Sequence, residues 1–316
     1  MIATNAGGIR VLRYGMFREQ VAGLEAVLAD GSVIDLLDRL PKDNAGHDLR
    51  QVFIGSEGTL GVVTRARLRL HPAPRSEALA FLALPGFAAA LTLLPRLRTE
   101  IGDLLSAFEV IDAGLYAETT AFLKVRPPVA PGAGLYAMVE IQGRDPERDA
   151  ARFETALTDA TGAGLIDDAV LAASGREMGA LWAIRDGLSD YLFAQPDMTG
   201  HDIGLPLSRM EAFLTETARR LRAVDPAARP MAFGHLGDGN LHYMVQTREP
   251  AATAQVVMAA VAAAGGTISA EHGIGTEKAK WLPLVRSPAA IASMRRLKRA
   301  FDPAGILNRG RILSEE

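Results

Sequence analysis

One short stretch, residues 234–242 with the sequence GHLGDGNLH, constrains this chain more than any other. An Asp-Gly pair flanked by apolar and β-forming residues is a strong signal for a tight β-hairpin turn. With the turn centred between Asp238 and Gly239, His235 lies directly opposite His242. Directly opposed residues on one sheet face have Cβ atoms about 4.5–5.5 Å apart. The stretch therefore predicts an antiparallel hairpin whose two imidazoles can share one metal ion.

A second glycine-rich stretch, residues 269–275 with the sequence SAEHGIG, offers a carboxylate for the same purpose. Glu271 would complete a set of two His and one carboxylate, which leaves open positions for water or substrate. Its neighbour His272 would point to the opposite side of an extended chain, so one residue can bind metal while the other transfers a proton. Each His taken alone is most simply an ordinary turn or strand residue. Three of the chain's six histidines lie in these two stretches, however, and this favours a site.

The composition excludes several kinds of site and partner. The chain has no cysteine, so disulfides and thiolate ligands are excluded, and a metal would need His, Asp, Glu or water. A formal net charge of −3 gives no electrostatic case for binding nucleic acid. No apolar run approaches the ~20 residues that span a bilayer, and residues 1–8 lack the features of a signal peptide. We therefore expect a cytoplasmic protein without a transmembrane segment, at most peripheral to a membrane.

The 316 residues fit about two domains. Residues 1–75 are rich in glycine and β-forming segments, and residues 76–250 alternate strand-like and helical patterns. Residues 251–316 hold two helices, the loop with Glu271 and His272, and a tail at 306–313 that should be extended. Because the hairpin needs antiparallel pairing, we expect an α+β fold with helices on one face of the sheet. The expected strands are 23–28, 32–34, 62–70, 78–84, 104–111, 135–142 and 200–206. The expected helices are 48–53, 87–99, 146–161, 177–192, 251–264, 289–301 and one from Ser208, its N-cap, to about 224.

Two glycine loops and one arginine are further candidates for function. The loops Asn5-Ala6-Gly7-Gly8 and 55–61 let backbone amides approach a phosphate or a planar ring, although either can equally be a tight turn. No G-x-G-x-x-G or Walker pattern follows a strand, so a nicotinamide-binding unit is unsupported. Arg185 lies near the apolar face of the helix expected at 177–192. It is either a surface residue with a buried stem or a clamp for a carboxylate.

Five segments spread along the whole chain together resemble one family, the FAD-linked D-2-hydroxyacid dehydrogenases. This family of vanillyl-alcohol-oxidase type flavoproteins includes D-lactate and D-2-hydroxyglutarate dehydrogenases and the flavin subunit of glycolate oxidase. The segments are TNAGGIRVLRYG (4–15), KDNAGHDLRQVFIGSEGTLGVVTRARLRL (42–70), FGHLGDGNLHY (233–243), ISAEHGIGTEKAKWL (268–282) and FDPAGILNRGRIL (301–313).

The resemblance implies a division of labour along the chain. Residues 1–75 match the C-terminal part of a VAO/PCMH-type FAD-binding domain, and 76–300 match a cap domain that binds substrate and metal on an antiparallel sheet with helices packed on it. Residues 301–316 match a tail that returns to the flavin domain. Relatives carry further residues upstream, including the glycine loop for the FAD diphosphate, so we expect this chain to lack the N-terminal part of that domain.

The resemblance also implies residue roles. His235, His242 and Glu271 match metal ligands, for zinc or else manganese or iron. His272 matches the proposed catalytic base, and Arg185 matches an arginine that binds the substrate carboxylate. The residues that match FAD contacts are Asn5, Ala6, Gly7, Gly8, Gly55, Glu57, Gly58, Gly61, Val62 and Asn308.

The implied reaction is a metal-assisted oxidation of a small D-2-hydroxy acid, of the D-lactate or D-2-hydroxyglutarate type, to the 2-oxo acid. FAD would pass the electrons to an electron-transfer flavoprotein, a quinone or a cytochrome, and a homodimer is compatible with the family. Many relatives have a lysine where this chain has Gly200. Relatives that use hydroxyglutarate have a polar asparagine where this chain has Met244, and this difference weakly disfavours a dicarboxylate. Two alternatives stay open: a metal-dependent hydrolase, and a cap-domain fragment that is inactive without a partner chain carrying the missing flavin part.

Overall fold

The computed structural model describes residues 1–38, 40 and 42–314, and these form two compact units. Unit 1 comprises Met1–Gly8, Tyr14–Pro72 and Gly265–Glu316, and unit 2 comprises Ile9–Arg13 and Ala73–Ala264. Residues 39, 41 and 315–316, which fall within the predicted flavin part and tail, lie outside the described residues. Residues 265–300, which the sequence assigns to the cap domain, belong to unit 1. The functional boundaries at 75 and 300 stay predictions.

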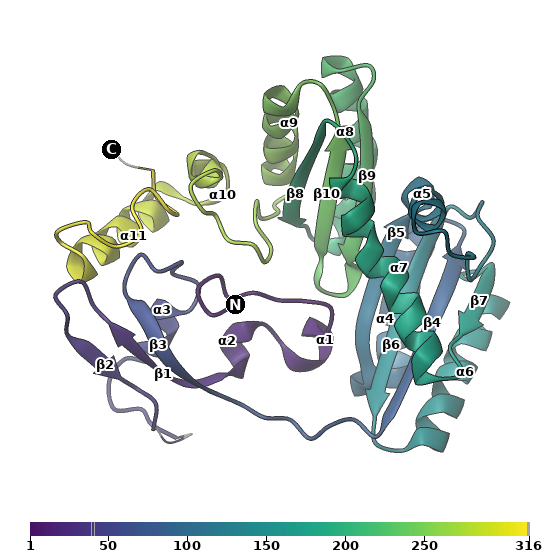
Figure 1. The fold of residues 1–316 in the computed structure, drawn as a ribbon, viewed down its shortest axis with the longest axis horizontal. Coiled ribbons are helices and arrows are strands. Elements are labelled where there is room, and N and C mark those ends of the chain that lie inside the picture. Colours follow the sequence, from purple (N-terminus) through teal and green to yellow (C-terminus); the bar gives the residue numbers. More distant parts are fainter. Residues whose placement is uncertain (39, 41, 315–316) are drawn as a thin grey trace. The chain divides into compact units, whose positions relative to one another are not determined.

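Unit 1 is built on a three-stranded antiparallel sheet of order β2-β1-β3. The turn between β1 and β2 uses the predicted Asp-Gly pair, with Gly31 at φ +83°. The apolar core under the sheet includes Leu24 and Phe53, and Phe301 packs edge-on against Phe53 with ring centroids 5.9 Å apart. The elements are β1 Val21–Val27, β2 Val33–Asp35, β3 Val62–Leu68, α2 Phe17–Gln20, α3 Arg50–Phe53, α10 Leu282–Val285 and α11 Pro288–Phe301, with α1 Val11–Tyr14 beginning in unit 2 (Figure 1).

The predicted extended tail is wrong. Residues 302–314 form successive turns and contain no strand. Four of the residues from 302 to 314 have positive φ, namely Gly305, Asn308, Gly310 and Ile312. Left-handed residues reverse the chain direction, so the segment folds back and Ile312 N–H donates to the carbonyl of Gly275 at 2.9 Å.

Unit 2 is built on a seven-stranded sheet of order β7-β4-β6-β5-β9-β10-β8, in which every neighbouring pair is antiparallel. The strands are β4 Ser76–Leu84, β5 Leu105–Asp112, β6 Leu135–Gly143, β7 Asp168–Leu171, β8 Met198–Gly204, β9 Arg229–His235 and β10 Asn240–Gln246. The helices are α4 Phe87–Ile101, α5 Ala113–Leu123, α6 Pro146–Gly162, α7 Gly175–Phe193, α8 Leu207–Val224 and α9 Pro250–Ala263. The predicted α+β class is confirmed.

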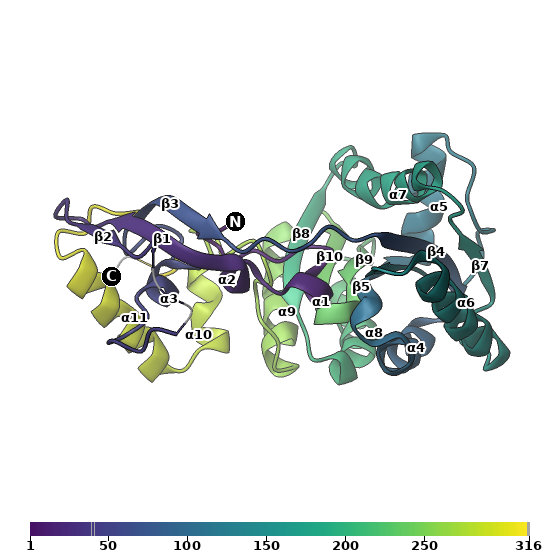
Figure 2. The ribbon, with the colours of Figure 1, turned by 90° about the horizontal axis from the view of Figure 1, so that it is seen from below.

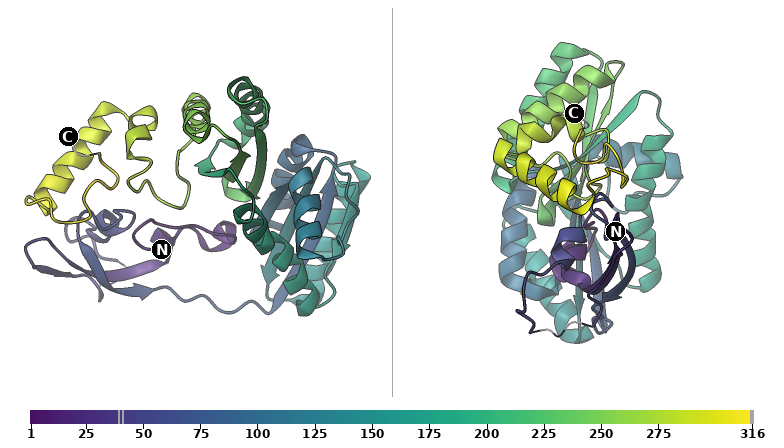
Figure 3. Two further views of the ribbon diagram at one scale, coloured as in Figure 1. Left: turned by 45° about the horizontal axis from the view of Figure 1, so that its top comes forward. Right: turned by 90° about the vertical axis from the view of Figure 1, so that its left-hand side faces the viewer.

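Helices cover both faces of this sheet, so the prediction of a single covered face is wrong. Helices α5 and α7 pack on one face, and α4, α6, α8 and α9 lie on the other (Figures 2 and 3). All nine residues of β6 are buried, which requires cover on both sides. The core beneath α5 and α7 includes Phe81, Tyr116, Tyr136 and Leu188.

Two local details also differ from expectation. Helix α8 begins at Leu207 with Pro206 at its N-cap and no side-chain cap, so the predicted capping role of Ser208 is wrong. Helix α5 and strand β7 were not predicted. The N-terminus of α5 is nevertheless capped by the carboxylate of Asp112, which accepts from the N–H of Gly114 and Leu115.

Among the described residues no helix is long and apolar enough to cross a membrane.

Candidate metal and substrate site

The hairpin forms as predicted, but its register differs. A 3-10 turn over Leu236–Asp238 and Gly239 at φ +85° connect β9 to β10, and His242 is opposite Phe233 rather than His235. The predicted direct opposition of the two histidines is therefore wrong, because the connection is longer than a two-residue turn. The shift is by two residues, which keeps both side chains on one face. Their ring centroids are 5.3 Å apart with an interplanar angle of 82°.

A buried carboxylate, Glu109, holds the ring of His235. Glu109 lies on β5 directly opposite His235 on β9, and its Oε1 is 2.5 Å from His235 Nδ1. Burial by itself would raise the pKa of Glu109. The hydrogen bond from His235 and the charge and hydrogen bond of Arg185 outweigh that effect, and the pKa lies below its ordinary value. Glu109 is therefore ionised and can only accept hydrogen bonds.

Arg185 shares the same carboxylate. Its Nε donates to Glu109 Oε2 at 2.9 Å, and its guanidinium carbon lies 5.5 Å from the centroid of the Phe233 ring. The side chain of Arg185 is only 12% exposed. This favours an ordered role over the alternative of a surface arginine with a buried stem. Substrate binding by Arg185 stays a prediction.

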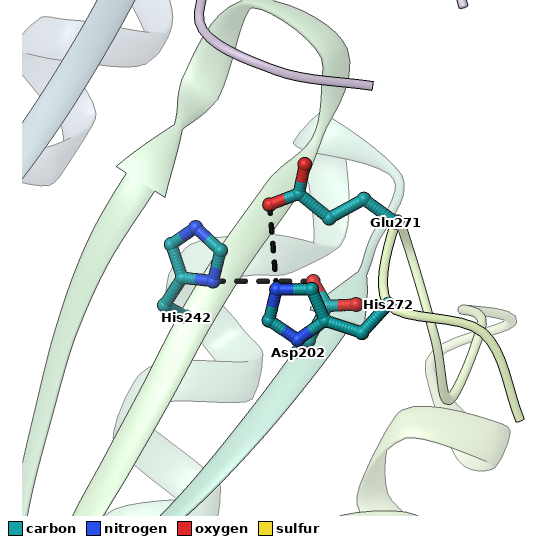
Figure 4. Close-up of side chains that lie close together, drawn as sticks. All are labelled: Asp202, His242, Glu271 and His272. Carbon is teal, nitrogen blue, oxygen red and sulfur yellow. Dashed lines mark ion pairs between the residues drawn. The ribbon is translucent and has the colours of Figure 1, made fainter. Parts of the chain in front are cut away.

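His242 has its own acidic neighbour, Asp202, which the sequence reasoning missed. The two residues are directly opposed on β10 and β8, with His242 Nδ1 3.9 Å from Asp202 Oδ1 (Figure 4). Asp202 is 5% exposed and also accepts from the side-chain amide of Asn240 at 2.8 Å. Only the cross-strand register brings this carboxylate to His242, so a local sequence pattern could not have identified it.

Glu271 and His272 lie in the loop before α10, in unit 1. Their side chains do not point to opposite sides as predicted, because His272 Nε2 lies 3.8 Å from Glu271 Oε1 (Figure 4). The loop is bent rather than extended, with Gly273 at φ +85° and Gly275 at φ +58°. The side chain of His272 is 64% exposed and that of Glu271 is 15% exposed. Their roles as base and metal ligand stay predictions.

The predicted flavin-contacting residues gather within unit 1. The N-terminal segment and the glycine loop 55–61 lie side by side, since Gly55 N–H donates to the carbonyl of Ile2 at 3.0 Å and Glu57 N–H to that of Ala3 at 2.7 Å. Asn5, at φ +49°, accepts from the N–H of Arg18 at 2.8 Å. A Cβ at Gly8 would meet no neighbour in this unit, and Val62 is 51% exposed. Gly7, Gly8, Gly55 and Gly58 are partly exposed, whereas the other residues of the loop 55–61 are buried.

Glu57 and Asn308 have structural partners that the sequence did not indicate. The Glu57 carboxylate accepts from the N–H of Ile274 at 2.7 Å and of Gly275 at 2.8 Å. The side-chain amide of Asn308 donates to the backbone carbonyl of Glu57, and a Cβ at Gly58 would lie 3.3 Å from the nitrogen of that amide. The glycine loop is thereby tied both to the loop that carries Glu271 and to the tail.

A cavity of about 690 Å³ opens in unit 1 between the glycine loop, α11 and the tail. Gly55 and Asn308, both predicted to contact flavin, line it. Its lining also includes the cationic side chains Arg295, Lys298, Arg299, Arg309 and Arg311, and none of the described residues lining it is acidic. Such a lining suits an anionic ligand.

Residues 73–312 match the family model of the C-terminal domain of FAD linked oxidases, and residues 1–37 match that of the FAD binding domain. The chain belongs to the FAD-linked oxidase family. Among curated relatives, mitochondrial D-2-hydroxyglutarate dehydrogenase of Bos taurus is 40% identical over 319 residues, which cover 99% of this chain and 58% of that protein. The enzyme of the same name from Rattus norvegicus is 38% identical, covering 97% and 58%. This FAD-linked oxidase chain thus spans rather more than half the length of these relatives.

The fold of this FAD-linked oxidase chain is also found in solved structures. The structure of p-cresol methylhydroxylase with substrate bound matches with a TM-score of 0.74 and 14% identity, covering 98% of this chain and 68% of that one. At this identity the likeness concerns the fold alone. It confirms the predicted combination of a partial VAO/PCMH-type flavin domain and a sheet with helices packed on it.

Proposed function

We propose that this chain supplies the substrate-binding part of an FAD-dependent, metal-assisted oxidation of a D-2-hydroxy acid to the 2-oxo acid. One observation carries the proposal: Arg185, His235 and His242 gather around Phe233 on one sheet face of unit 2. The Phe233 and His242 ring centroids are 4.9 Å apart, and those of His235 and His242 are 5.3 Å apart. The similarity to D-2-hydroxyglutarate dehydrogenases along 99% of the chain supports it.

The donor set fits a divalent cation, with zinc preferred to manganese or iron. Imidazole nitrogens bind Zn²⁺ at about 2.0–2.1 Å, so two rings whose centroids are 5.3 Å apart can reach one ion. We propose His235, His242 and Glu271 as ligands, with Asp202 beside His242 as a further oxygen donor or as its hydrogen-bond acceptor. When bound, such a cation supplies a Lewis acid for the substrate hydroxyl.

The loops of unit 1 fit FAD in chemical character. Left-handed Gly55 leaves backbone close to any ligand of the cavity, and the cationic lining suits phosphates. When bound, FAD supplies the acceptor for the two electrons that leave C2 of the substrate. We propose contacts to it from the predicted set that includes Asn5, Gly8 and Asn308.

The side chains of this chain would orient the substrate and move its proton. Arg185 keeps both Nη groups for the substrate carboxylate, since its Nε is bonded to Glu109. His272 would take the hydroxyl proton as general base, a role that typically contributes about 10²–10⁴-fold to the rate. Its exposed imidazole can return that proton to water after turnover.

The pair Gly200 and Met244 bears on which acid is oxidised. The two residues are directly opposed on β8 and β10, and a Cβ at Gly200 would lie 3.0 Å from the sulfur of Met244. Met244 also packs against the apolar core of unit 2. Neither residue offers a hydrogen bond from its side chain to a second carboxylate. This favours a monocarboxylate of the D-lactate type over a dicarboxylate, with electrons passed to an electron-transfer flavoprotein, a quinone or a cytochrome.

The test is oxidation of D- and L-lactate and of D-2-hydroxyglutarate with an artificial electron acceptor. The chain would be assayed alone and co-expressed with the upstream flavin part of a relative, before and after chelation. We expect D-specific reduction of the acceptor that chelation abolishes and that added zinc restores. Activity only on co-expression would show that a partner chain must carry the rest of the flavin site. Hydrolysis of an ester without an acceptor would instead indicate a metal-dependent hydrolase and refute the proposal.

A further inference from the structure

We propose that Glu109 is the positioning residue of this site, whose carboxylate sets the orientation of both the His235 ring and the Arg185 guanidinium. The positioning itself follows from unit 2 alone. What the two oriented groups bind, a metal ion and a substrate carboxylate, rests on the proposed function. Glu109 would touch neither ligand, so it acts through its two partners.

Glu109 is buried in the sheet, where a carboxylate lowers the stability of the fold unless its charge is paired. It lies between Phe108 and Val110 in a strand with seven buried residues, and it is itself 1% exposed. A buried carboxylate is strongly destabilising without partners. Each oxygen of Glu109 has one partner, and the two partners come from different elements, His235 from β9 and Arg185 from α7. One side chain thereby joins two candidate binding groups.

The carboxylate determines which nitrogen of His235 carries the hydrogen. Glu109 Oε2 accepts from the guanidinium of Arg185, which can only donate, and Oε1 of the same carboxylate faces His235 Nδ1, so Nδ1 carries the hydrogen of that contact; in the neutral ring the lone pair is then on Nε2. Carboxylates bonded in this way to metal-binding histidines fix the tautomer and ring orientation. Without Glu109 the ring could present either nitrogen.

The same carboxylate determines which nitrogens of the Arg185 guanidinium can bind a ligand. The Nε contact at 2.9 Å fixes the plane of the guanidinium, while Phe233 lies beneath it. The two Nη groups then form a fork of fixed direction, the geometry that a carboxylate accepts in a bidentate pair. Lysine, a point charge on a flexible stem, could not use this arrangement.

Glu140 provides a matched control in the same sheet. It lies on the adjacent strand β6 opposite Ala107, so it shares the sheet face of Glu109, and it is fully buried. Its hydrogen bonds go to Arg10, with both contacts at 2.8 Å, and to Ser106 at 2.7 Å. Glu140→Gln therefore removes an equally buried charge paired with an arginine, but not the contact to His235.

The experiment compares the full wild-type chain with Glu109→Gln and Glu140→Gln. The tautomer of His235 is measured in metal-free protein by long-range ¹H–¹⁵N NMR, assigned with a His235→Asn variant, and zinc affinity is measured by competition with a chromophoric chelator. We expect the Nδ1–H tautomer in wild type and in Glu140→Gln, and a mixture in Glu109→Gln. Zinc affinity should fall about 10–100-fold in Glu109→Gln only.

The outcomes separate this inference from the proposed function. If Glu109→Gln keeps the wild-type tautomer and zinc affinity, or matches Glu140→Gln in both, the positioning role is refuted. If wild type binds no zinc but Glu109→Gln alone loses the fixed tautomer, the positioning role stands and the metal proposal fails. Should Glu109→Gln not fold, the wild-type spectrum decides, because an Nε2–H tautomer at His235 contradicts the inference and an Nδ1–H tautomer supports it.

Discussion

At the scale of single residues, a substitution at Arg185 tests whether the site needs two parallel Nη donors or only a positive charge. Arg185→Lys keeps the charge but cannot both bond Glu109 through Nε and offer two parallel donors. A hydrogen bond to a charged group contributes about 1.5–3 kcal/mol, so we expect KM for the proposed substrate, a D-2-hydroxy acid, to rise roughly 10–100-fold with a smaller change in kcat. Steady-state kinetics of the reconstituted enzyme measure this.

The control for that prediction is Arg96→Lys, which alters an ion pair within α4 between side chains that are 29% and 31% exposed. It should leave both kinetic constants unchanged. If Arg185→Lys lowered kcat alone with KM unaltered, Arg185 would act in the chemical step rather than in binding the substrate carboxylate.

A second prediction at this scale concerns Glu57, which was expected to contact FAD. Its carboxylate accepts from the N–H of Ile274 and Gly275, so Glu57→Ala would leave two backbone donors without their partner. We expect the amides of Ile274 and Gly275 to exchange faster with solvent, and stability to fall by about 1–3 kcal/mol. Hydrogen exchange followed by mass spectrometry and chemical denaturation measure these two effects.

Glu25→Ala serves as the comparison, because Glu25 pairs with the exposed Arg65 at the surface of the same unit. That variant should leave exchange in 271–275 unchanged. Unaltered exchange at Ile274 in Glu57→Ala would show that the carboxylate does not hold this loop and would leave flavin contact as its sole predicted role.

At the scale of elements, the junction between α11 and the tail depends on one buried acid, Asp302. Its carboxylate accepts from the N–H of Ile306 at 3.0 Å and of Leu307 at 2.8 Å, and Lys298 donates to it. Burial alone would raise the pKa of Asp302, but the Lys298 contact and the two backbone donors lower it below the ordinary 3.8. The folded state is therefore stabilised at pH above 3.8 and loses this contribution as the pH falls through the lowered value.

Asp302→Asn should accordingly lower the free energy of unfolding at pH 7. Between pH 5 and the lowest pH at which the chain folds, this free energy should fall less steeply in the variant than in wild type. The measurement is denaturant unfolding across that pH range, beside Asp159→Asn on the exposed face of α6. Parallel stability curves for Asp302→Asn and wild type would contradict the assignment, because a group with equal pKa in both states adds no pH dependence.

The elements also show what sequence patterns could and could not provide. The Asp-Gly turns and the 3.6-residue spacing in α7 are local signals, and they predicted the hairpin and that helix. The register of β9 on β10 depended on the conformation of 236–239, and the sequence did not reveal it. Glu109 sits in the run SAFEVID, which is an ordinary strand pattern, so its importance emerges only when β9 and α7 are placed beside β5. Asp202 was missed for the same reason.

At the scale of the whole molecule, the two units have separate apolar cores. The core of unit 1 contains Phe53, and the core of unit 2 contains Phe81, with no residue shared between them. Both rings are almost fully buried. Truncating such a ring to alanine costs about 3–5 kcal/mol, through lost burial and the cavity that remains. Each truncation should therefore lower the stability of the unit that contains it.

We therefore expect calorimetry to resolve two thermal transitions in the full chain. Phe53→Ala should lower the transition temperature of unit 1, and Phe81→Ala should lower that of unit 2, while the other transition temperature is unchanged.

Zinc should raise both transition temperatures if its ligands come from both units, as the proposed set of His235, His242 and Glu271 requires, since a ligand stabilises every state that binds it. A single transition that both truncations lower equally would show one cooperative unit. A zinc effect confined to unit 2 would remove Glu271 from the ligand set and leave the two histidines and Asp202 as its members.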